Sequence, residues 1–292
     1  MTALSRFFTG FLHYWDKSHT FLRAVAERIH RWLKDLSYRF GEKSTRNPGY
    51  GVVRERQIKS AISDRLFNQK KLPVPYGLGW DERVVEYPWL FSRLDDKPGK
   101  MLDAGSVLNF DFLLRRPELQ SKQLVISTLA PECDNFWWRG VSYTYEDLRA
   151  ASFRDGYFDF VVCLSVIEHV GMDNSVYTQN AKPRETASGD AVAFIKELHR
   201  VLKPGGTLFL SFPFGKAADH GWLKVFDMST VEKLSAAFHP RMESQNFFRH
   251  GPKGWYACSP EQAADAGYNT VPGENPARLV AAESVACLEW VK

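Results

Sequence analysis

From residue 99 onward, short apolar runs alternate with segments of helical periodicity, and this alternation limits the fold more than any other feature. The run Phe158–Leu164 is nearly continuous, as in a central strand buried on both faces of a parallel sheet. A helix is expected at Ala191–Leu202, where Lys203-Pro204-Gly205-Gly206 ends it. The other expected strands lie near 99–103, 123–127, 141–145 and 207–212. Strands that alternate with helices predict a parallel sheet with crossover helices.

The flanking segments complete this fold. After the fifth strand we expect a helix near 229–238, a strand near 245–249 and a terminal strand at Ser284–Val291. Before the first strand, residues 81–94 begin with acids and continue with apolar residues, which indicates a helix that Pro88 should kink or restart. The predicted fold class is α/β.

The stretch Gly99–Phe110 carries the strongest local signal for a ligand. An apolar strand ends at Asp103, and Gly105 follows in the turn. Glycine has no Cβ, so the backbone can approach a ligand closely there. In a dinucleotide-binding fold the acid comes about 20 residues after the glycines. Here the acid precedes the glycine, which argues against a nicotinamide-dependent oxidoreductase.

The first 60 residues have a different character from the remainder. They hold 12 Lys and Arg against 5 Asp and Glu, so the net charge of +4 comes from this segment. Apolar residues between Leu22 and Phe40 recur at helical spacing, with arginines largely between them. A basic, aromatic-rich amphipathic helix can lie on an anionic membrane surface. The alternative interpretation is a helix packed on its own domain or on a partner.

Three segments follow from these patterns. We predict a basic amphipathic helical extension at 1–45, a linker or wrapping segment at 46–80, and one α/β domain at 81–292. The apolar runs near the N-terminus are too short for a membrane span. Patterns typical of nucleic-acid binding are absent from the sequence. The four cysteines have no CxxC spacing, so neither a metal site nor a disulfide framework is indicated, and a cytoplasmic location is expected.

Several stretches together resemble the class I S-adenosylmethionine (SAM)-dependent methyltransferases. They are LDAGSVLN at 102–109, the fourth-strand stretch at 153–170, RVLKPGG at 200–206 and Asp147-Leu148. The segments DERVVEYPW, TLAPE and EHVGMDN narrow the resemblance to a bacterial subgroup associated with cell-surface polysaccharides. The resemblance covers roughly residues 81–292. It implies a Rossmann-like, seven-stranded, mostly parallel sheet with an antiparallel last strand, plus the N-terminal helical extension.

The resemblance also implies the cofactor site. SAM would be bound by the first loop, by the ends of strands two and four, and by the turn after strand three. Thr128 stands where the family's ribose-binding acid ends strand two, so Thr128 or Glu132 would take that role. Asp147 would accept the adenine amino group, or else cap the next helix. The residues expected to bind the cofactor are Asp103, Gly105, Ser106, Asn109, Thr128, Asp147, Leu148, Ser165 and Val166.

Two residues after strand four are the main catalytic candidates. His169 is expected as the general base that removes a proton from an oxygen acceptor, and Glu168 would orient it or bind a hydroxyl. The alternative is that both only hold the loop in place. His220 is a second candidate base, or a surface histidine. No metal is expected.

These residues support two functional hypotheses. The first is O-methylation of a small-molecule or saccharide-type hydroxyl by a cytoplasmic enzyme, with peripheral contact to the inner membrane face through residues 1–45. The second is a catalytically inactive binding or scaffolding subunit of the same fold. It is motivated by Val107 and Asn109, which stand where the family's later glycines would be.

Overall fold

A computed structural model describes residues 20–42, 47–68, 72–175, 190–269 and 281–292. Its centre is an eight-stranded sheet with the strand order β3-β2-β1-β4-β5-β10-β8-β9. The parallel strands are β1 (Gly99–Ala104), β2 (Lys122–Thr128), β3 (Ser142–Tyr145), β4 (Phe158–Leu164) and β5 (Leu202–Pro213). The antiparallel strands are β8 (Met242–Gly251), β9 (Gly254–Cys258) and β10 (Ser284–Val291).

This topology confirms the predicted Rossmann-like α/β fold. The sheet has one strand more than the seven expected, because β9 forms a hairpin with β8 at the edge. A separate two-stranded ribbon joins β6 (Ala218–Asp219) to β7 (Lys224–Val225). The strand order reverses between β1 and β4, which both lie at the centre of the sheet. In open α/β folds, ligands bind beyond the carboxyl ends of strands at such a reversal.

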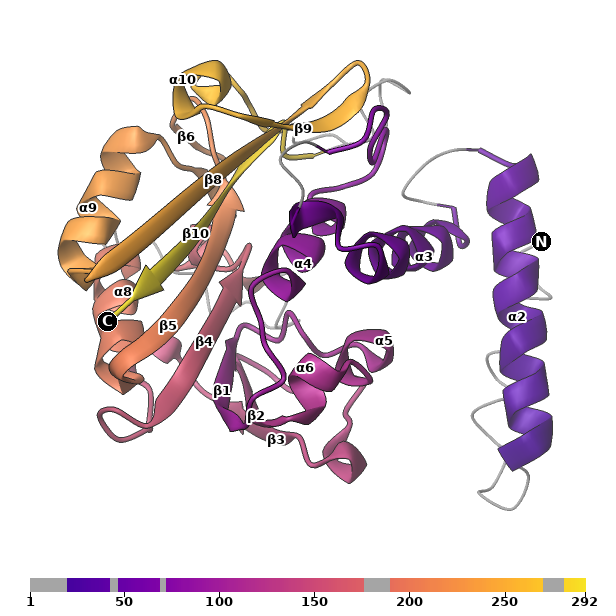
Figure 1. Cartoon of the computed structure of the whole chain (residues 1–292), viewed down its shortest axis with the longest axis horizontal. Helices are drawn as coiled ribbons and strands as arrows, with labels where there is room; N and C mark the ends of the chain where they lie inside the picture. Colours follow the sequence, from indigo (N-terminus) through magenta and orange to yellow (C-terminus); the bar gives the residue numbers. More distant parts are fainter. Residues whose placement is uncertain (1–19, 43–46, 69–71, 176–189, 270–280) are drawn as a thin grey trace.

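Helices cover both faces of the sheet (Figure 1). One face carries α8 (Asp190–Val201) and α9 (Met228–Phe238), and the other carries α3 (Tyr50–Ser63) and α4 (Arg83–Phe91). Each face of the sheet has its own hydrophobic core. Alternate residues of β4 contribute to both, since Val161 packs on the α8 side and Val162 on the α4 side. The short helices are α5 (Asp111–Leu114), α6 (Pro117–Gln120) and α10 (Pro260–Ala263). Single 3₁₀ turns are η2 (Leu66–Asn68), η3 (Trp137–Arg139), η4 (Leu148–Ala150) and η5 (Ile167–His169).

The segment expected as a linker contains a helix of the folded body. Ile58, Ala61 and Ile62 of α3 are buried in the same core as α4 and the sheet. The basic residues between them in the sequence obscured this periodicity. The N-terminal helix α2 (Thr20–Phe40) packs next to α3 and stands at the edge of the molecule, away from the sheet (Figure 1). None of the helices in the described ranges is long and apolar enough to cross a membrane.

Helix α4 runs through Pro88 as one helix, so of the two predicted effects, a kink or a restart, the restart does not occur. Proline has no N–H, so the carbonyl group of Val84, four residues earlier, loses its partner within the helix. The hydroxyl of Tyr76 donates a hydrogen bond to that carbonyl at 2.5 Å, in a site where both side chains are buried. An outside donor therefore replaces the missing bond and keeps the helix continuous.

Candidate functional site

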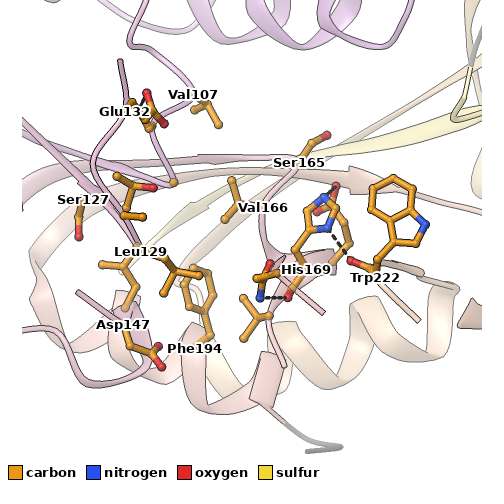
Figure 2. Close-up of a pocket in the computed structure, with 18 of the residues that line it drawn as sticks. Val107, Ser127, Leu129, Glu132, Asp147, Ser165, Val166, His169, Phe194 and Trp222 are labelled. Carbon is orange, nitrogen blue, oxygen red and sulfur yellow. Dashed lines mark hydrogen bonds and ion pairs between the residues drawn. The ribbon is translucent and has the colours of Figure 1, made fainter. Parts of the chain in front are cut away.

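One cavity of about 430 Å³ lies at the carboxyl ends of β1, β2, β4 and β5, where the strand order predicts a ligand. That volume is typical of a small-molecule or cofactor site. Figure 2 shows Glu132, Ser127, Leu129 and Asp147 on one side of it, and His169 and Trp222 on the other, with Val166 between them. We call the first side the β1–β3 end and the second the acceptor end.

Seven of the nine predicted cofactor residues line this cavity: Gly105, Ser106, Thr128, Asp147, Leu148, Ser165 and Val166. Gly105 has φ +117°, and a Cβ there would lie 2.4 Å from Cγ2 of Val166. The loop after β1 therefore needs glycine to pass this close to β4. Ser106 and Ser165 also have positive φ, at 64° and 48°. Such conformations are uncommon for serine and concentrate at functional sites.

Asp103 does not line the cavity, contrary to its expected contact with a ligand. Its side chain is fully buried, and its two carboxylate oxygens accept hydrogen bonds from Val107 N (3.0 Å) and Leu108 N (2.7 Å). Burial raises the pKa of Asp103 to about 7, against the effect of these two N–H donors. Both oxygens are used within the chain, so Asp103 fixes the shape of the first loop (residues 104–110). Residues of that loop, and not Asp103 itself, line the cavity.

Asn109 is the other predicted residue outside the cavity lining. Its side-chain amide donates to Glu132 Oε2 (2.9 Å) and to the carbonyl of Asp134 (2.9 Å), and its oxygen accepts from the hydroxyl of Tyr143 (2.8 Å). Ser106 donates to the same Glu132 oxygen at 2.8 Å. Glu132 thus ties the first loop to the loop after β2, while it also lines the cavity.

Asp147 lines the cavity, but its carboxylate is engaged by Arg149. It accepts from the backbone N of Arg149 (2.9 Å) and forms an ion pair with that guanidinium, which lowers the pKa of Asp147. The capping role considered for Asp147 is therefore present in the structure. Arg149 also pairs with Asp190 of α8 at 2.6 Å. Leu148 and Phe194 add buried apolar surface to this end.

His169 lies at the acceptor end with its ring oriented by the backbone. Its Nδ1 lies 2.8 Å from the carbonyl oxygen of Trp222, and its ring stacks on the Trp222 ring at 5.5 Å between centroids (Figure 2). A carbonyl only accepts, so Nδ1 carries the proton and Nε2 is the basic nitrogen of the neutral ring. Burial lowers the pKa of His169, which keeps it neutral at pH 7. Its Nε2 lies 4.0 Å from Glu168 Oε1.

His220 is not among the residues that line the cavity. Its ring lies 5.8 Å from the ring of Tyr268, which does line it. The structure therefore brings Glu168 and His169 together at the acceptor end and leaves His220 behind the cavity wall.

Sequence analysis missed residues that reach the acceptor end from the N-terminal helices. Arg54 comes from α3, and Glu82 and Arg83 come from the start of α4. Behind them, the fully buried Glu86 accepts from the hydroxyls of Ser165 and Ser211, both at 2.6 Å. Arg83 donates to the second Glu86 oxygen (3.0 Å) and to the carbonyl of Leu164 (3.0 Å). These bonds fix α4 to the carboxyl ends of β4 and β5.

Fold and cavity together define an open α/β protein with a ligand site at the carboxyl edge of its parallel strands. A protein-family model described as "Methyltransferase domain" matches residues 121–210, which is less than half of the chain. A comparison with curated proteins found no match.

Similar solved structures are distant in sequence. The 1,6-didemethyltoxoflavin-N1-methyltransferase of Burkholderia thailandensis is 12% identical, with 92% of this chain and 89% of that chain covered and a TM-score of 0.43. A SAM-dependent methyltransferase of Methanosarcina mazei is 15% identical, with 70% and 96% covered and a TM-score of 0.41. Phosphoethanolamine N-methyltransferase 2 of Haemonchus contortus is 16% identical, with 51% and 34% covered and a TM-score of 0.36.

Proposed function

We propose that this chain is a SAM-dependent methyltransferase that methylates a hydroxyl group of a small-molecule or saccharide-type acceptor. The observation that carries the proposal is the cavity at the carboxyl ends of β1, β2 and β4, lined by seven residues that the sequence predicts for SAM. The family match at 121–210 supports it, because that segment runs from β2 through β5. We also propose that the chain belongs to the bacterial subgroup associated with cell-surface polysaccharides.

The β1–β3 end has the chemistry that SAM requires. Apolar side chains of Leu129, Leu148 and Val166 suit the adenine ring, and Glu132 or Thr128 suits the ribose hydroxyls. The hydroxyl of Ser127 is buried without a partner, which leaves it available to a ligand. The backbone of Gly105 and Ser106 would face the remainder of the cofactor.

The acceptor end has the chemistry for proton removal. SAM supplies a methyl group on a sulfonium; the S–CH₃ bond breaks as the acceptor oxygen forms its O–CH₃ bond, which leaves a neutral thioether. His169 takes the proton of the acceptor hydroxyl at Nε2, because Nδ1 is already protonated toward Trp222. Glu168 Oε1 lies 4.0 Å from Nε2, so Glu168 would stabilise the imidazolium when it is ionised. Alignment of the acceptor by the cavity wall supplies much of the remaining rate.

The test is calorimetric titration of the full chain with S-adenosylhomocysteine (SAH), followed by methyl transfer from labelled SAM. We expect saturable SAH binding and no binding of NAD⁺. Absence of SAH binding would overturn the proposal. Binding of SAH without transfer to any hydroxyl compound would favour the inactive binding subunit.

Helix α2 supports a second proposal, peripheral contact with an anionic membrane on the cytoplasmic face. Its polar side docks on α3, where Asp35 pairs with Arg56 at 3.0 Å and Arg31 with Glu55 at 2.9 Å. Tyr38 is buried against Tyr50 of α3, but two other aromatic side chains of α2 are exposed, Trp32 at 59% and Phe40 at 85%. The exposed arginines 28, 31 and 39 lie on the same helix. Exposed apolar groups beside basic ones suit a lipid surface with negative charge.

This second proposal assigns membrane contact to the extension at 1–45, of which residues 1–19 lie outside the described residues. Helix α3 of the segment at 46–80 shares a core with the domain at 81–292. Trp32→Glu with Phe40→Glu should abolish pelleting with vesicles that contain phosphatidylglycerol, while SAH affinity is unchanged. Met242→Glu is the matched control, since Met242 is 69% exposed on β8. Salt should weaken the binding, because charges are screened over about 8 Å at physiological ionic strength. Equal pelleting of the double variant and the control would contradict the proposal.

A further inference from the structure

Among the residues that the structure describes, two carboxyl groups at the acceptor end each have an oxygen without a hydrogen-bond partner. The side chain of Glu168 is 2% exposed, and its Oε2 is buried without a hydrogen bond. Oε2 of Glu82, at the N-terminus of α4, is also buried and unpaired. Both residues line the cavity. A buried polar atom without a partner is costly, so two of them in one cavity wall point to a ligand that supplies the missing donors.

Among the described residues, Arg83 is a cation that acts on both acids and lowers the pKa of each, but less than burial raises it. The charged and titratable groups near them are Asp81, Arg83 and Glu86 at α4, Arg54 from α3, His169 from η5 and Cys163 from β4. Arg54 forms an ion pair with Asp81, and Arg83 forms one with Glu86. His169 is neutral at pH 7. The ion pairs of both guanidinium groups are with other carboxylates, so four acids (Asp81, Glu82, Glu86 and Glu168) surround two guanidinium groups.

The two acids respond to this environment by holding their protons. Burial, with the neighbouring Asp81 and Glu86, raises the pKa of Glu82 to about 8. Burial likewise raises the pKa of Glu168 well above its usual range, and Glu86 and Glu82 add to the effect. A cation in the cavity would reverse these shifts by favouring both ionised forms.

Aromatic rings complete the same end of the cavity. The rings of Trp222 and Tyr268 lie 5.9 Å apart, and Tyr87 lines the wall that α4 provides. Aromatic faces attract ammonium groups, and carboxylates form charge-assisted hydrogen bonds with them. The combination of unpaired carboxyls and aromatic rings is suited to an organic cation.

We propose that the methyl acceptor carries an ammonium group, which binds Glu82 and Glu168 and presents a neighbouring hydroxyl to His169. The inference rests on the proposed methyltransferase function and narrows its acceptor to amino alcohols, which include amino sugars. The ammonium N–H groups donate to the two unpaired carboxyl oxygens. The carboxyl groups lose their protons to solvent when the cation binds.

The probes are 1-amino-2-propanol and 1,2-propanediol, which differ by one ammonium group in place of a hydroxyl. Each is titrated into the full chain saturated with SAH and followed by ligand-observed NMR. The amine should bind about tenfold or more tightly, the contribution of a charge-assisted hydrogen bond. Its affinity should rise with pH between 6 and 8, by up to about tenfold per pH unit for each proton released.

Variants test whether the two acids are responsible. Glu168→Gln and Glu82→Gln, which lie on different elements, should each weaken binding of the amine and reduce its pH dependence. Glu261→Gln is the matched control, because Glu261 is exposed on α10 and is not among the residues that line the cavity. Its amine affinity should not change.

Equal affinity for the two probes, or wild-type amine affinity in both glutamine variants, would overturn the inference. SAH titration of each variant separates this outcome from failure of the proposed function. A chain that binds SAH but does not distinguish the probes retains the methyltransferase proposal and loses the ammonium site. A chain that does not bind SAH loses the first proposal itself.

Discussion

The first loop and the acceptor end line one cavity but satisfy their polar groups in opposite ways. In the first loop, Asp103 accepts two backbone N–H groups, and Glu132 accepts the side chains of Ser106 and Asn109. At the acceptor end, Glu82 and Glu168 each retain a buried oxygen without a partner. An unpaired buried group costs about 1–3 kcal/mol. If the cavity binds SAM and an acceptor as proposed, the first loop is held in one shape before binding, whereas the acceptor end would gain stability from a ligand that supplies donors.

This difference suggests how the two ligands are selected. A loop fixed by its own hydrogen bonds loses little conformational entropy on binding, which suits a cofactor common to every turnover. Unpaired buried groups penalise any molecule that cannot pair with them, which suits discrimination between acceptors. Three substitutions test this division, and they are ordered here by the size of the expected effect.

The largest effect is expected at His169. His169→Asn keeps a donor for the Trp222 carbonyl but removes Nε2, so turnover should fall by about 10²–10⁴-fold, as for loss of a general base. SAH affinity should stay unchanged, since the base acts at the acceptor end. Steady-state kinetics and calorimetry measure the two quantities. A greater loss of turnover in His220→Asn would assign the base to the other histidine.

The next effect concerns the first loop. Asp103→Ala removes both acceptors for Val107 N and Leu108 N and should weaken SAH binding about a hundredfold, since each buried N–H that loses its acceptor costs about 1–3 kcal/mol. Asp103→Asn keeps one acceptor, so its SAH affinity should lie between those of the wild type and Asp103→Ala. Calorimetry gives the affinities, and thermal unfolding checks that the variants fold. Unchanged SAH affinity in Asp103→Ala would show that the loop shape does not depend on this carboxylate.

The smallest effect is on stability at the acceptor end. The pKa of Glu168 is raised in the folded chain, so between its unfolded value near 4.5 and its folded value the native state holds an extra proton. The stability from this group is therefore present at low pH and lost as pH rises. Glu168→Gln should reduce the decline of unfolding free energy with pH by up to about 1.4 kcal/mol per pH unit. Urea unfolding between pH 5 and 8 measures it, and an identical decline in both proteins would contradict the raised pKa.

The sheet could be predicted from the sequence because strands that are buried on both faces appear as nearly continuous apolar runs. Phe158–Leu164 and Ser284–Val291 were predicted with the bounds that β4 and β10 have in the structure. Helix α3 was missed because its buried residues are interrupted by arginines and a lysine. Strand β9 was missed because it is short and lies at the edge, paired only with β8 in the sheet.

The site was less predictable because its residues are far apart in the chain. The order of motifs predicted which loops would converge, and seven of the nine cofactor candidates do line one cavity. The sequence could not show whether the carboxylate of Asp103 points to a ligand or back to its own loop. Arg54 belongs to no motif, and Glu82 lies in the DERVVEYPW segment, to which the sequence assigned no role in the site. Only the packing of α3 and α4 brings both residues to the cavity that Glu168 lines.

The hydrogen bond from Tyr76 to Val84 makes the acceptor end depend on a segment that does not touch a ligand. Tyr76 also accepts the backbone N–H of Trp255 in β9 through its own carbonyl at 2.7 Å. The start of α4, which carries Glu82 and Arg83, is thus tied to the far edge of the sheet. Substitutions of Tyr76 and Pro88 should consequently be non-additive. Pro88→Ala restores the hydrogen bond within the helix to the Val84 carbonyl, so it should recover part of the stability that Tyr76→Phe loses. The double variant should lose less stability than the sum of the two single variants.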